Sequence, residues 1–231
     1  MCHQLSVKNT TCLIFWTMLV LIAAALLVAV VLVARLVYVL RDIHQGKSLV
    51  LSQHKTVKTL VVLGSGGHTV EMLKMVAALD PLKYSPRIYV VADTDEISHK
   101  KLLEVEKDFK GEGNFVVEVI PRTREVGQSW ITSAFTTLRA LISSLLVLVQ
   151  HRPVLILSNG PGTCVPLCGG AVILRVLGMF PSRVVFVESL CRVRSLSLSG
   201  QLLYPLSDHF LVQWPQLTES HPRARCLGRL V

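Results

Sequence analysis

The sequence has few charged residues, and acidic ones are the scarcest. Charged residues make up only 17% of the 231 residues, and 24 Lys and Arg outnumber 15 Asp and Glu, which leaves a net charge of +9. Hydrophobic residues make up 51%, which excludes a disordered chain. The length suits one ordinary domain with an appendage and excludes two full catalytic domains.

The basic residues form no run that interleaves with aromatic side chains, so nucleic-acid binding has little support. The net positive charge instead suits an anionic membrane surface or a phosphate-bearing ligand.

Cysteine pairs with the spacing of metal sites or disulfide frameworks are also missing. The six cysteines are Cys2, Cys12, Cys164, Cys168, Cys191 and Cys226. They contain no C-x-x-C pair and no C-x-x-C-H, so the sequence predicts neither a zinc site nor a disulfide framework, and no metal is expected. Cys164 and Cys168 are expected on one helical face as small apolar residues.

No Asp, Glu, Lys, Arg or His occurs between Asn9 and Ala34, and this run exceeds the roughly 20 residues that cross a bilayer. It is longer than the apolar region of a cleaved signal peptide and has only Lys8 before it, so an anchor is favoured over a signal peptide. Basic residues predominate after it, which places the following body in the cytosol. The predicted order is a luminal N-terminus over 1–12, a transmembrane anchor over 13–40, a linker over 41–58 and a cytosolic Rossmann-like domain over 59–231.

After the linker, short β-branched runs alternate with longer helical patterns, which is typical of an α/β fold with a parallel sheet. Such sheets bind ligands at the carboxyl ends of their strands. The expected strands are Thr59 to Leu63, Arg87 to Ala92, Phe115 to Ile120, Val154 to Leu157, Val184 to Val187 and His209 to Gln213. The expected helices are Thr69 to Leu79, Ile97 to Lys107, Ile131 to Gln150 and Gly162 to Leu177.

Two further apolar stretches, Ala140 to Val149 and Gly162 to Phe180, are interpreted as helices that line the sheet and not as membrane spans. The first is too short to span a bilayer, and the second contains Pro166 and Arg175. For either stretch, a helix half-inserted at the membrane interface is the alternative.

The strongest local motif, Gly64-Ser65-Gly66-Gly67-His68-Thr69, follows the first strand and opens a helix. Its glycines let a ligand approach the backbone, and the free N–H groups at the helix start attract an anion such as a diphosphate. A tight turn is the alternative. Thr69 replaces the last glycine of G-x-G-x-x-G and no Gly-Lys-Ser/Thr follows, which argues against a dinucleotide dehydrogenase and a P-loop NTPase.

His68, in the first turn of that helix, is the candidate general base; capping the helix start is an equal alternative. Asp93 follows the second strand at a distance suited to a ribose or sugar hydroxyl, with helix capping as its alternative. For Asp95 and Glu96 capping is favoured over ligand contact. Arg122 and Arg124 suit phosphate oxygens or a surface ion-pair cluster.

The fourth strand ends in a second glycine-rich turn with Asn159, Gly160 and Gly162. Two such turns at one sheet edge are more specific than either alone. Glu188 closes the fifth strand, where it could orient His68, bind a sugar hydroxyl, or pair with Arg192 or Arg194.

These motifs together resemble the asparagine-linked glycosylation protein fourteen family, the membrane-anchor subunits of a eukaryotic UDP-N-acetylglucosamine transferase. The resemblance rests on the first glycine loop and on Ala92 to Glu96, Ile120 to Trp130, Asn159 to Cys164, Val187 to Val193, Ser197 to Gly200, Val212 to Pro215 and the terminal Leu-Gly-Arg-Leu-Val. It implies one Rossmann-like half of a GT-B glycosyltransferase.

The resemblance also implies a reaction and partners. GlcNAc would pass from UDP-GlcNAc to GlcNAc-diphospho-dolichol with inversion, at the cytosolic face of the endoplasmic reticulum or of the nuclear envelope. A soluble partner subunit would hold most of the donor, no cofactor is expected, and the enzyme of the preceding dolichol step is a second expected partner. His68 corresponds to a candidate base, and Gly160 and Gly162 correspond to acceptor-side contacts. Leu230 and Val231 are apolar at an exposed chain end, which suggests docking onto the partner.

Two rival readings remain. One is a purely non-catalytic membrane scaffold for the soluble enzyme. The other is a membrane-bound NAD(P) oxidoreductase, which Thr69 disfavours.

Overall fold

The computed structural model describes residues 2–45, 56–109, 113–123 and 128–230. Its body is built around a seven-stranded sheet in the order β3-β2-β1-β4-β5-β6-β7, and every neighbouring pair is parallel. The strands are β1 Thr59–Val62, β2 Arg87–Ala92, β3 Phe115–Ile120, β4 Leu155–Asn159, β5 Arg183–Val187, β6 His209–Val212 and β7 Ala224–Cys226. The α/β prediction is confirmed.

The order of the strands reverses between β1 and β4, which are paired in the middle of the sheet. The chain adds β2 and β3 on one side of β1 and then returns to add β4 to β7 on the other. Ligands of open parallel sheets bind at such a switch point, outside the carboxyl ends of the strands.

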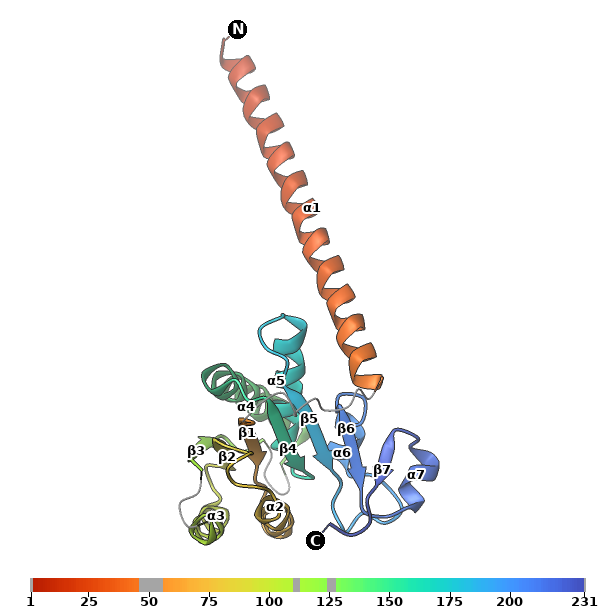
Figure 1. Ribbon diagram of the computed structural model, residues 1–231. Helices are drawn as coiled ribbons and strands as arrows, with labels where there is room; N and C mark the ends of the chain where they lie inside the picture. Colours follow the sequence, from red (N-terminus) through yellow and green to blue (C-terminus); the bar gives the residue numbers. More distant parts are fainter. Residues whose placement is uncertain (1, 46–55, 110–112, 124–127, 231) are drawn as a thin grey trace.

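Helices cover both faces of the sheet (Figure 1). The helices of the described residues are α1 Cys2–His44, α2 Gly67–Ala77, α3 Glu96–Asp108, α4 Trp130–His151, α5 Cys164–Val176, α6 Leu198–Leu203 and α7 Gln216–Ser220. Leu60 and Val62 of β1 pack with α4 and α5, whereas Val61 and Leu63 pack with α2 and α3. Side chains of a strand alternate between faces, so this apolar run buries residues on both sides.

The two apolar stretches of the body behave differently. α5 is largely buried and has 13 residues, too few to cross a bilayer, so the prediction of a buried crossover helix is confirmed. α4 buries Ala140 and Leu148 against the sheet, as predicted, but its opposite side is exposed. Residues Ile131–His151 are also long and apolar enough to cross a membrane, judged by length and composition. In their most apolar 18-residue segment, 28% is buried in the body.

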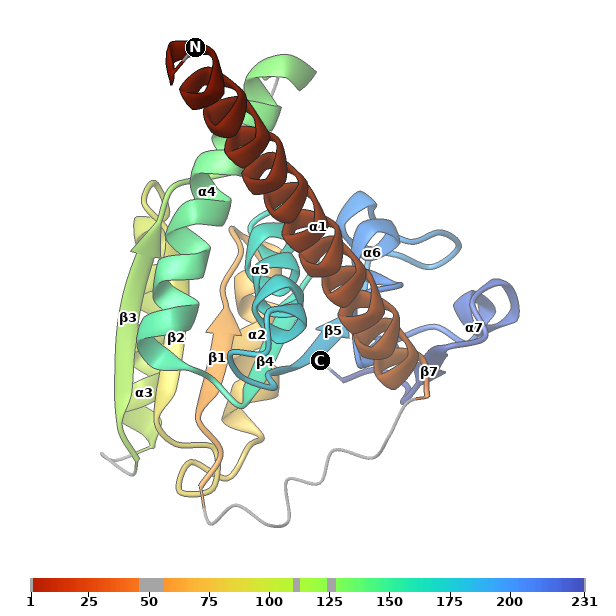
Figure 2. The same cartoon turned by 90° about the horizontal axis from the view of Figure 1, so that it is seen from above.

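α1 is a single helix that rises from the body on the side covered by α4 and α5 (Figures 1 and 2). Residues Trp16–His44 are apolar and long enough to cross a membrane. The helix includes the first residues of the predicted linker, because Ile43 is buried with Val39 against Val172 of α5. Residues 46–55 of that linker lie outside the described part of the chain, as do Lys47 and Lys55.

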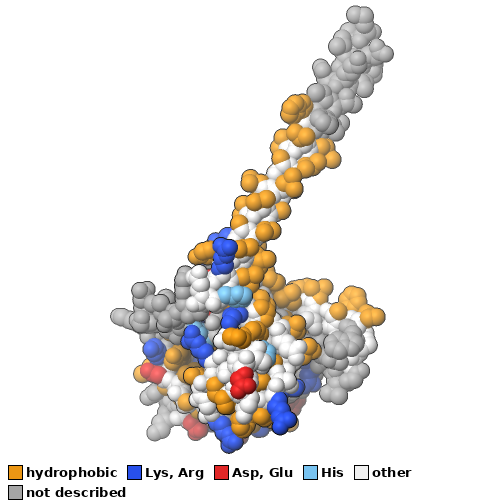
Figure 3. Space-filling view, turned by 90° about the vertical axis from the view of Figure 1, so that its right-hand side faces the viewer, with side chains coloured by type: hydrophobic (Ala, Val, Ile, Leu, Met, Phe, Trp, Pro, Cys, Tyr) orange, Lys and Arg blue, Asp and Glu red, His pale blue; other side chains and the backbone are white. Residues whose placement is uncertain are grey.

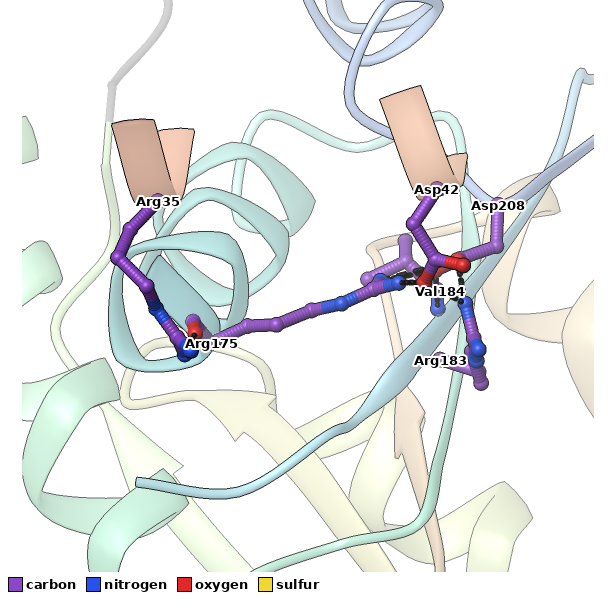
Figure 4. Close-up of polar contacts among 6 residues, drawn as sticks. All are labelled: Arg35, Asp42, Arg175, Arg183, Val184 and Asp208. Atoms are coloured by element: carbon purple, nitrogen blue, oxygen red, sulfur yellow. Dashed lines mark hydrogen bonds and ion pairs between the residues drawn. The ribbon is translucent and has the colours of Figure 1, made fainter. Parts of the chain in front are cut away.

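A network of charges fixes the base of α1 to the body (Figure 4). The Asp42 carboxylate of α1 accepts hydrogen bonds from Arg175 and from Arg183 Nη1, the latter at 2.9 Å. Asp208 accepts from the same two arginines at 2.9 and 2.7 Å. Both carboxylates and Arg175 are largely buried. Salt screens ion pairs in buried positions only weakly.

Arg35, about two helical turns before Asp42 in α1, forms a second attachment to the body. Its Nη2 and Nε donate to the carbonyls of Arg175 and Val176 at 3.0 and 3.1 Å. These carbonyls belong to the last turn of α5, the negative end of the helix dipole, which favours a cation. α1 is therefore joined to the body by side chains from two of its turns.

Candidate functional site

A cavity of about 440 Å³ lies at the carboxyl edge of the sheet, and some of the predicted site residues line it. Loops after β1, β2, β3 and β4 and the start of α6 form its walls. The lining residues are Leu63, Gly64, Ser65, His68, Ala92, Asp95, Arg122, Thr123, Pro161, Gly162, Thr163, Leu198 and Ser199. Gly64, Ser65, His68, Arg122 and Gly162 were predicted from the sequence.

The first glycine loop has exposed backbone next to this cavity. Gly66 has a positive φ of 64° and precedes α2 without a side-chain cap, and only glycine adopts this backbone easily. Ser65, Gly66 and Gly67 are exposed. The N–H groups of the first turn of α2 are thus open to an anion, in keeping with the predicted phosphate contact.

His68 is oriented by a chain of hydrogen bonds that the sequence did not predict. Its Nδ1 lies 3.0 Å from Asn159 Oδ1, and Asn159 Nδ2 donates to Glu71 Oε2 at 2.8 Å. Ser189 Oγ donates to the other Glu71 oxygen at 3.0 Å. A carboxylate only accepts, so it fixes the amide of Asn159 with its oxygen toward His68. Nδ1 then carries the proton, and Nε2 is left as an acceptor.

The second glycine loop is shaped by His68. A Cβ on Gly160 would lie 2.5 Å from His68 Cε1, and Gly160 also has a positive φ of 57°. A Cβ on Gly64 would lie 2.7 Å from Pro161 Cγ, so the two loops pack directly against one another. Gly160 and buried Asn159 therefore position His68 and do not line the cavity, in contrast to the contact role expected for them.

Thr69 also supports the loop. It is buried and its hydroxyl donates to the Gly64 carbonyl. Ser98 Oγ donates to Asp95 Oδ2 at 2.6 Å, and Asp95 caps α3 through Ser98 N–H. The capping predicted for Asp95 is confirmed, and Glu96 lies in the first turn of α3 as expected.

Arg122 is the cationic side chain among the described residues that line the cavity. Asp93 is exposed, and its Oδ1 accepts from the Arg122 backbone N–H at 3.3 Å. Asp93 thereby shapes the loop that carries Arg122, and it does not line the cavity. Arg124 lies outside the described residues.

Glu188 does not orient His68, in contrast to the expectation. It is fully buried, and its oxygens accept from Ser189 N–H at 3.0 Å and from Ser197 N–H at 2.9 Å. A Cβ on Gly200 would lie 2.2 Å from Glu188 Oε2. Glu188 thus ties the loop after β5 to α6, whose first residues line the cavity, and Asn159 takes the place next to His68.

Cysteine chemistry is absent from the described part of the cavity wall. Cys164 and Cys168 are fully buried in α5, which confirms their predicted apolar role. Burial raises the pKa of the Cys168 thiol to about 12, so it stays protonated and unreactive at neutral pH. Among the described residues, no three His, Cys, Asp or Glu side chains lie close enough to hold a metal ion.

With this geometry in view, the chain can be compared with known proteins. The family model described as oligosaccharide biosynthesis protein Alg14 like matches residues 59–230. This chain belongs to that family. It is 45% identical over 219 residues to the human protein named UDP-N-acetylglucosamine transferase subunit ALG14, across 92% of this chain and 98% of that protein. A Yarrowia lipolytica protein of the same name is 42% identical over 215 residues, across 91% and 98%. The resemblance stated from the sequence is confirmed.

Solved structures share the fold of this Alg14 family member. MurG of Acinetobacter baumannii superposes with a TM-score of 0.52 at 16% identity, over 74% of this chain and 45% of that chain. A UDP-N-acetylglucosamine 2-epimerase gives 0.54 at 17% identity, over 74% and 48%. The chain thus spans less than half of either structure, which agrees with the predicted half of a GT-B arrangement.

Proposed function

We propose that this chain is the acceptor-side subunit of a UDP-N-acetylglucosamine transferase that adds the second GlcNAc to GlcNAc-diphospho-dolichol. The observation that carries the proposal is a glycine-rich, anion-ready cavity with an oriented histidine, in a chain that spans less than half of the glycosyltransferase-like structures it superposes on. The printed names of its relatives as transferase subunits support it.

A separate soluble subunit completes the cleft and holds UDP-GlcNAc, without any cofactor. The C-terminal segment suits this contact, since the Leu230 N–H donates to Gln213 Oε1 at 3.2 Å beside the end of β6. Leu227 is exposed there, and Val231 lies outside the described residues.

α1 anchors this part of the active site at the cytosolic face of the endoplasmic reticulum membrane, with the nuclear envelope as the alternative location. Attachment turns a three-dimensional search for a lipid-borne acceptor into a search along the membrane surface.

The orientation of His68 supports an inverting transfer. The acceptor hydroxyl oxygen forms a bond to C1 of the donor GlcNAc as the bond from C1 to the UDP oxygen breaks, which inverts C1 and releases UDP. His68 Nε2 accepts the hydroxyl proton, while Nδ1–H donates to Asn159 Oδ1. The N–H groups of the first glycine loop and the Arg122 guanidinium bind the diphosphate of the acceptor.

The test is transfer of radiolabelled GlcNAc from UDP-GlcNAc to a GlcNAc-diphospho-lipid, by each subunit alone and by the pair. We expect activity only in the pair and a fall of about 100-fold or more with His68→Gln while the subunits still co-purify. His99→Gln, which changes an exposed histidine of α3, is the matched control. Full activity of the His68 variant would leave this chain a scaffold without a catalytic base.

A further inference from the structure

An apolar groove adjoins the polar cavity. It has a volume of about 530 Å³ and lies between α4, the start of α5 and α6. We call it the α4–α6 groove; its apolar lining includes Leu138, Leu141, Val165, Leu198 and Leu202. Three of these leucines are about half exposed, Leu138 at 56%, Leu198 at 54% and Leu202 at 50%. An apolar occupant that covered them would be stabilised by removing this surface from water.

The groove and the cavity are continuous. Four residues, Thr123, Gly162, Leu198 and Ser199, line both. A ligand with a polar head in the cavity can therefore extend an apolar tail into the groove without crossing a wall of protein. Few ligands combine a diphosphate with a hydrocarbon chain, and a polyprenyl diphosphate is one.

At its other side the groove leads onto the outer face of α4. Leu138 lines the groove and also belongs to a row of exposed apolar side chains on that helix, with Ile131, Phe135, Ile142 and Leu146. Hydrophobic side chains gather on the upper part of the body, on the side where α1 rises (Figure 3). The Asp42 and Arg35 contacts hold α1 in this direction. If α1 crosses a bilayer, the α4 face lies toward the membrane surface.

We propose that the α4–α6 groove binds the first isoprene units of the lipid diphosphate acceptor, and that the outer face of α4 leads the remaining chain to the bilayer. The proposal rests on the proposed function and adds to it a separate subsite for the hydrocarbon part of the acceptor. The polar cavity holds the sugar diphosphate, and the groove selects acceptors whose diphosphate carries an apolar chain.

The experiment compares two acceptors in the same detergent solution, with the full chain in complex with its soluble partner. One acceptor is GlcNAc-diphosphate linked to a chain of four isoprene units, and the other carries a single methyl group instead. The variant is Leu138→Gln with Leu202→Gln, and Leu202→Ser alone is a milder change should the double variant not fold. Leu82→Gln is the control, because Leu82 is a 59% exposed leucine remote from the groove.

We expect the double variant to raise KM for the four-isoprene acceptor about tenfold and to leave KM for the methyl acceptor unchanged. The Leu82 variant should change neither value. An equal rise with both acceptors, or no rise with either, would overturn the groove assignment.

Loss of co-purification with the soluble subunit would show that the groove holds the partner and would also overturn the assignment. No transfer by the unaltered complex to either acceptor would overturn the proposed function itself, and the groove's role with it. Transfer by the unaltered complex thus distinguishes failure of the groove assignment from failure of the proposed function.

Discussion

The amide of Asn159 decides what His68 can do. A neutral amide oxygen next to Nδ1 selects one tautomer of the imidazole without adding a charge to the site. Glu71 contacts Asn159 and not His68, so it acts on His68 through Asn159. Asn159 is therefore a positioning residue, and its loss should alter turnover more than binding.

Asn159→Ala should lower kcat of the reconstituted pair about 10- to 100-fold, with little change in KM for the acceptor, because the imidazole loses its tautomer and orientation. Steady-state kinetics with varied acceptor concentration measure the two constants separately. Asn114→Ala, which changes an exposed residue at the far edge of the sheet, is the control. A rise in KM alone would assign Asn159 to substrate binding.

His209 gives the fold a pH dependence away from the site. Burial and then the charge of Arg225 lower the pKa of His209, and its Nε2 is buried without a hydrogen-bond partner among the described residues. Below the ordinary pKa of about 6.5 the unfolded chain therefore binds this proton more readily than the folded one, so the free energy of unfolding falls as pH falls. His209→Gln should reduce the loss of stability between pH 7.5 and 5.5, measured by chemical unfolding.

His99→Gln, at an exposed position, should keep the full loss of stability over the same range. An unchanged slope in the His209 variant would mean that other groups carry the pH dependence.

The sequence predicted the site residues better than their roles. The glycine loops and His68 were found because glycines after a strand mark a site by local pattern alone. The chain Glu71–Asn159–His68 joins residues up to 91 positions apart through α2 and the end of β4, and no local pattern records such a contact. One signal was available, since Glu71 is three residues after His68 and so shares its helix face.

At the scale of elements, the base of α1 depends on Asp42. Its carboxylate lies between Arg175 of α5 and Arg183 of β5. Asp42→Asn therefore removes one of the two carboxylates that these largely buried cations share and leaves Asp208. We expect the free energy of unfolding to fall by about 1–3 kcal/mol. Hydrogen exchange of the α1 backbone near Val39 and Ile43 should also become faster.

Unfolding in detergent and hydrogen exchange by mass spectrometry test this expectation. Glu104→Gln, at an exposed position of α3, should change neither measurement. Exchange at the base of α1 as slow as in the unaltered chain would show that apolar packing alone holds the helix.

Element prediction succeeded where length and periodicity agreed. All six expected strands and four expected helices of the body are present within a few residues. α6, α7 and β7 were missed, because they contain only six, five and three residues, too few to show a period. The linker was predicted to begin at Arg41, but α1 continues to His44. This extension could not be predicted locally, because Ile43 is buried against α5, more than a hundred residues later in the chain.

For the whole molecule, the predicted orientation has a direct test with Cys191, which is exposed in the body. In sealed endoplasmic reticulum vesicles with the cytosolic face outward, a membrane-impermeant maleimide should label Cys191 without detergent. Cys164 and Cys168 should not react, because burial raises the pKa of both thiols. Cys226 is a second free and partly exposed thiol of the body, so Cys191→Ser together with Cys226→Ser should remove the label. Labelling only after permeabilisation would reverse the orientation.

The network around Asp42 also sets an order of events during synthesis. Asp42 is joined to Arg175 and Arg183, which follow it by 133 and 141 residues. α1 is therefore synthesised before its partners, Arg175 of α5 and Arg183 of β5. Until both arginines have been synthesised, the charge network cannot hold the base of α1 to the body. A chain that stops before Arg175 would therefore keep α1 but lack the charge contacts that join it to the body.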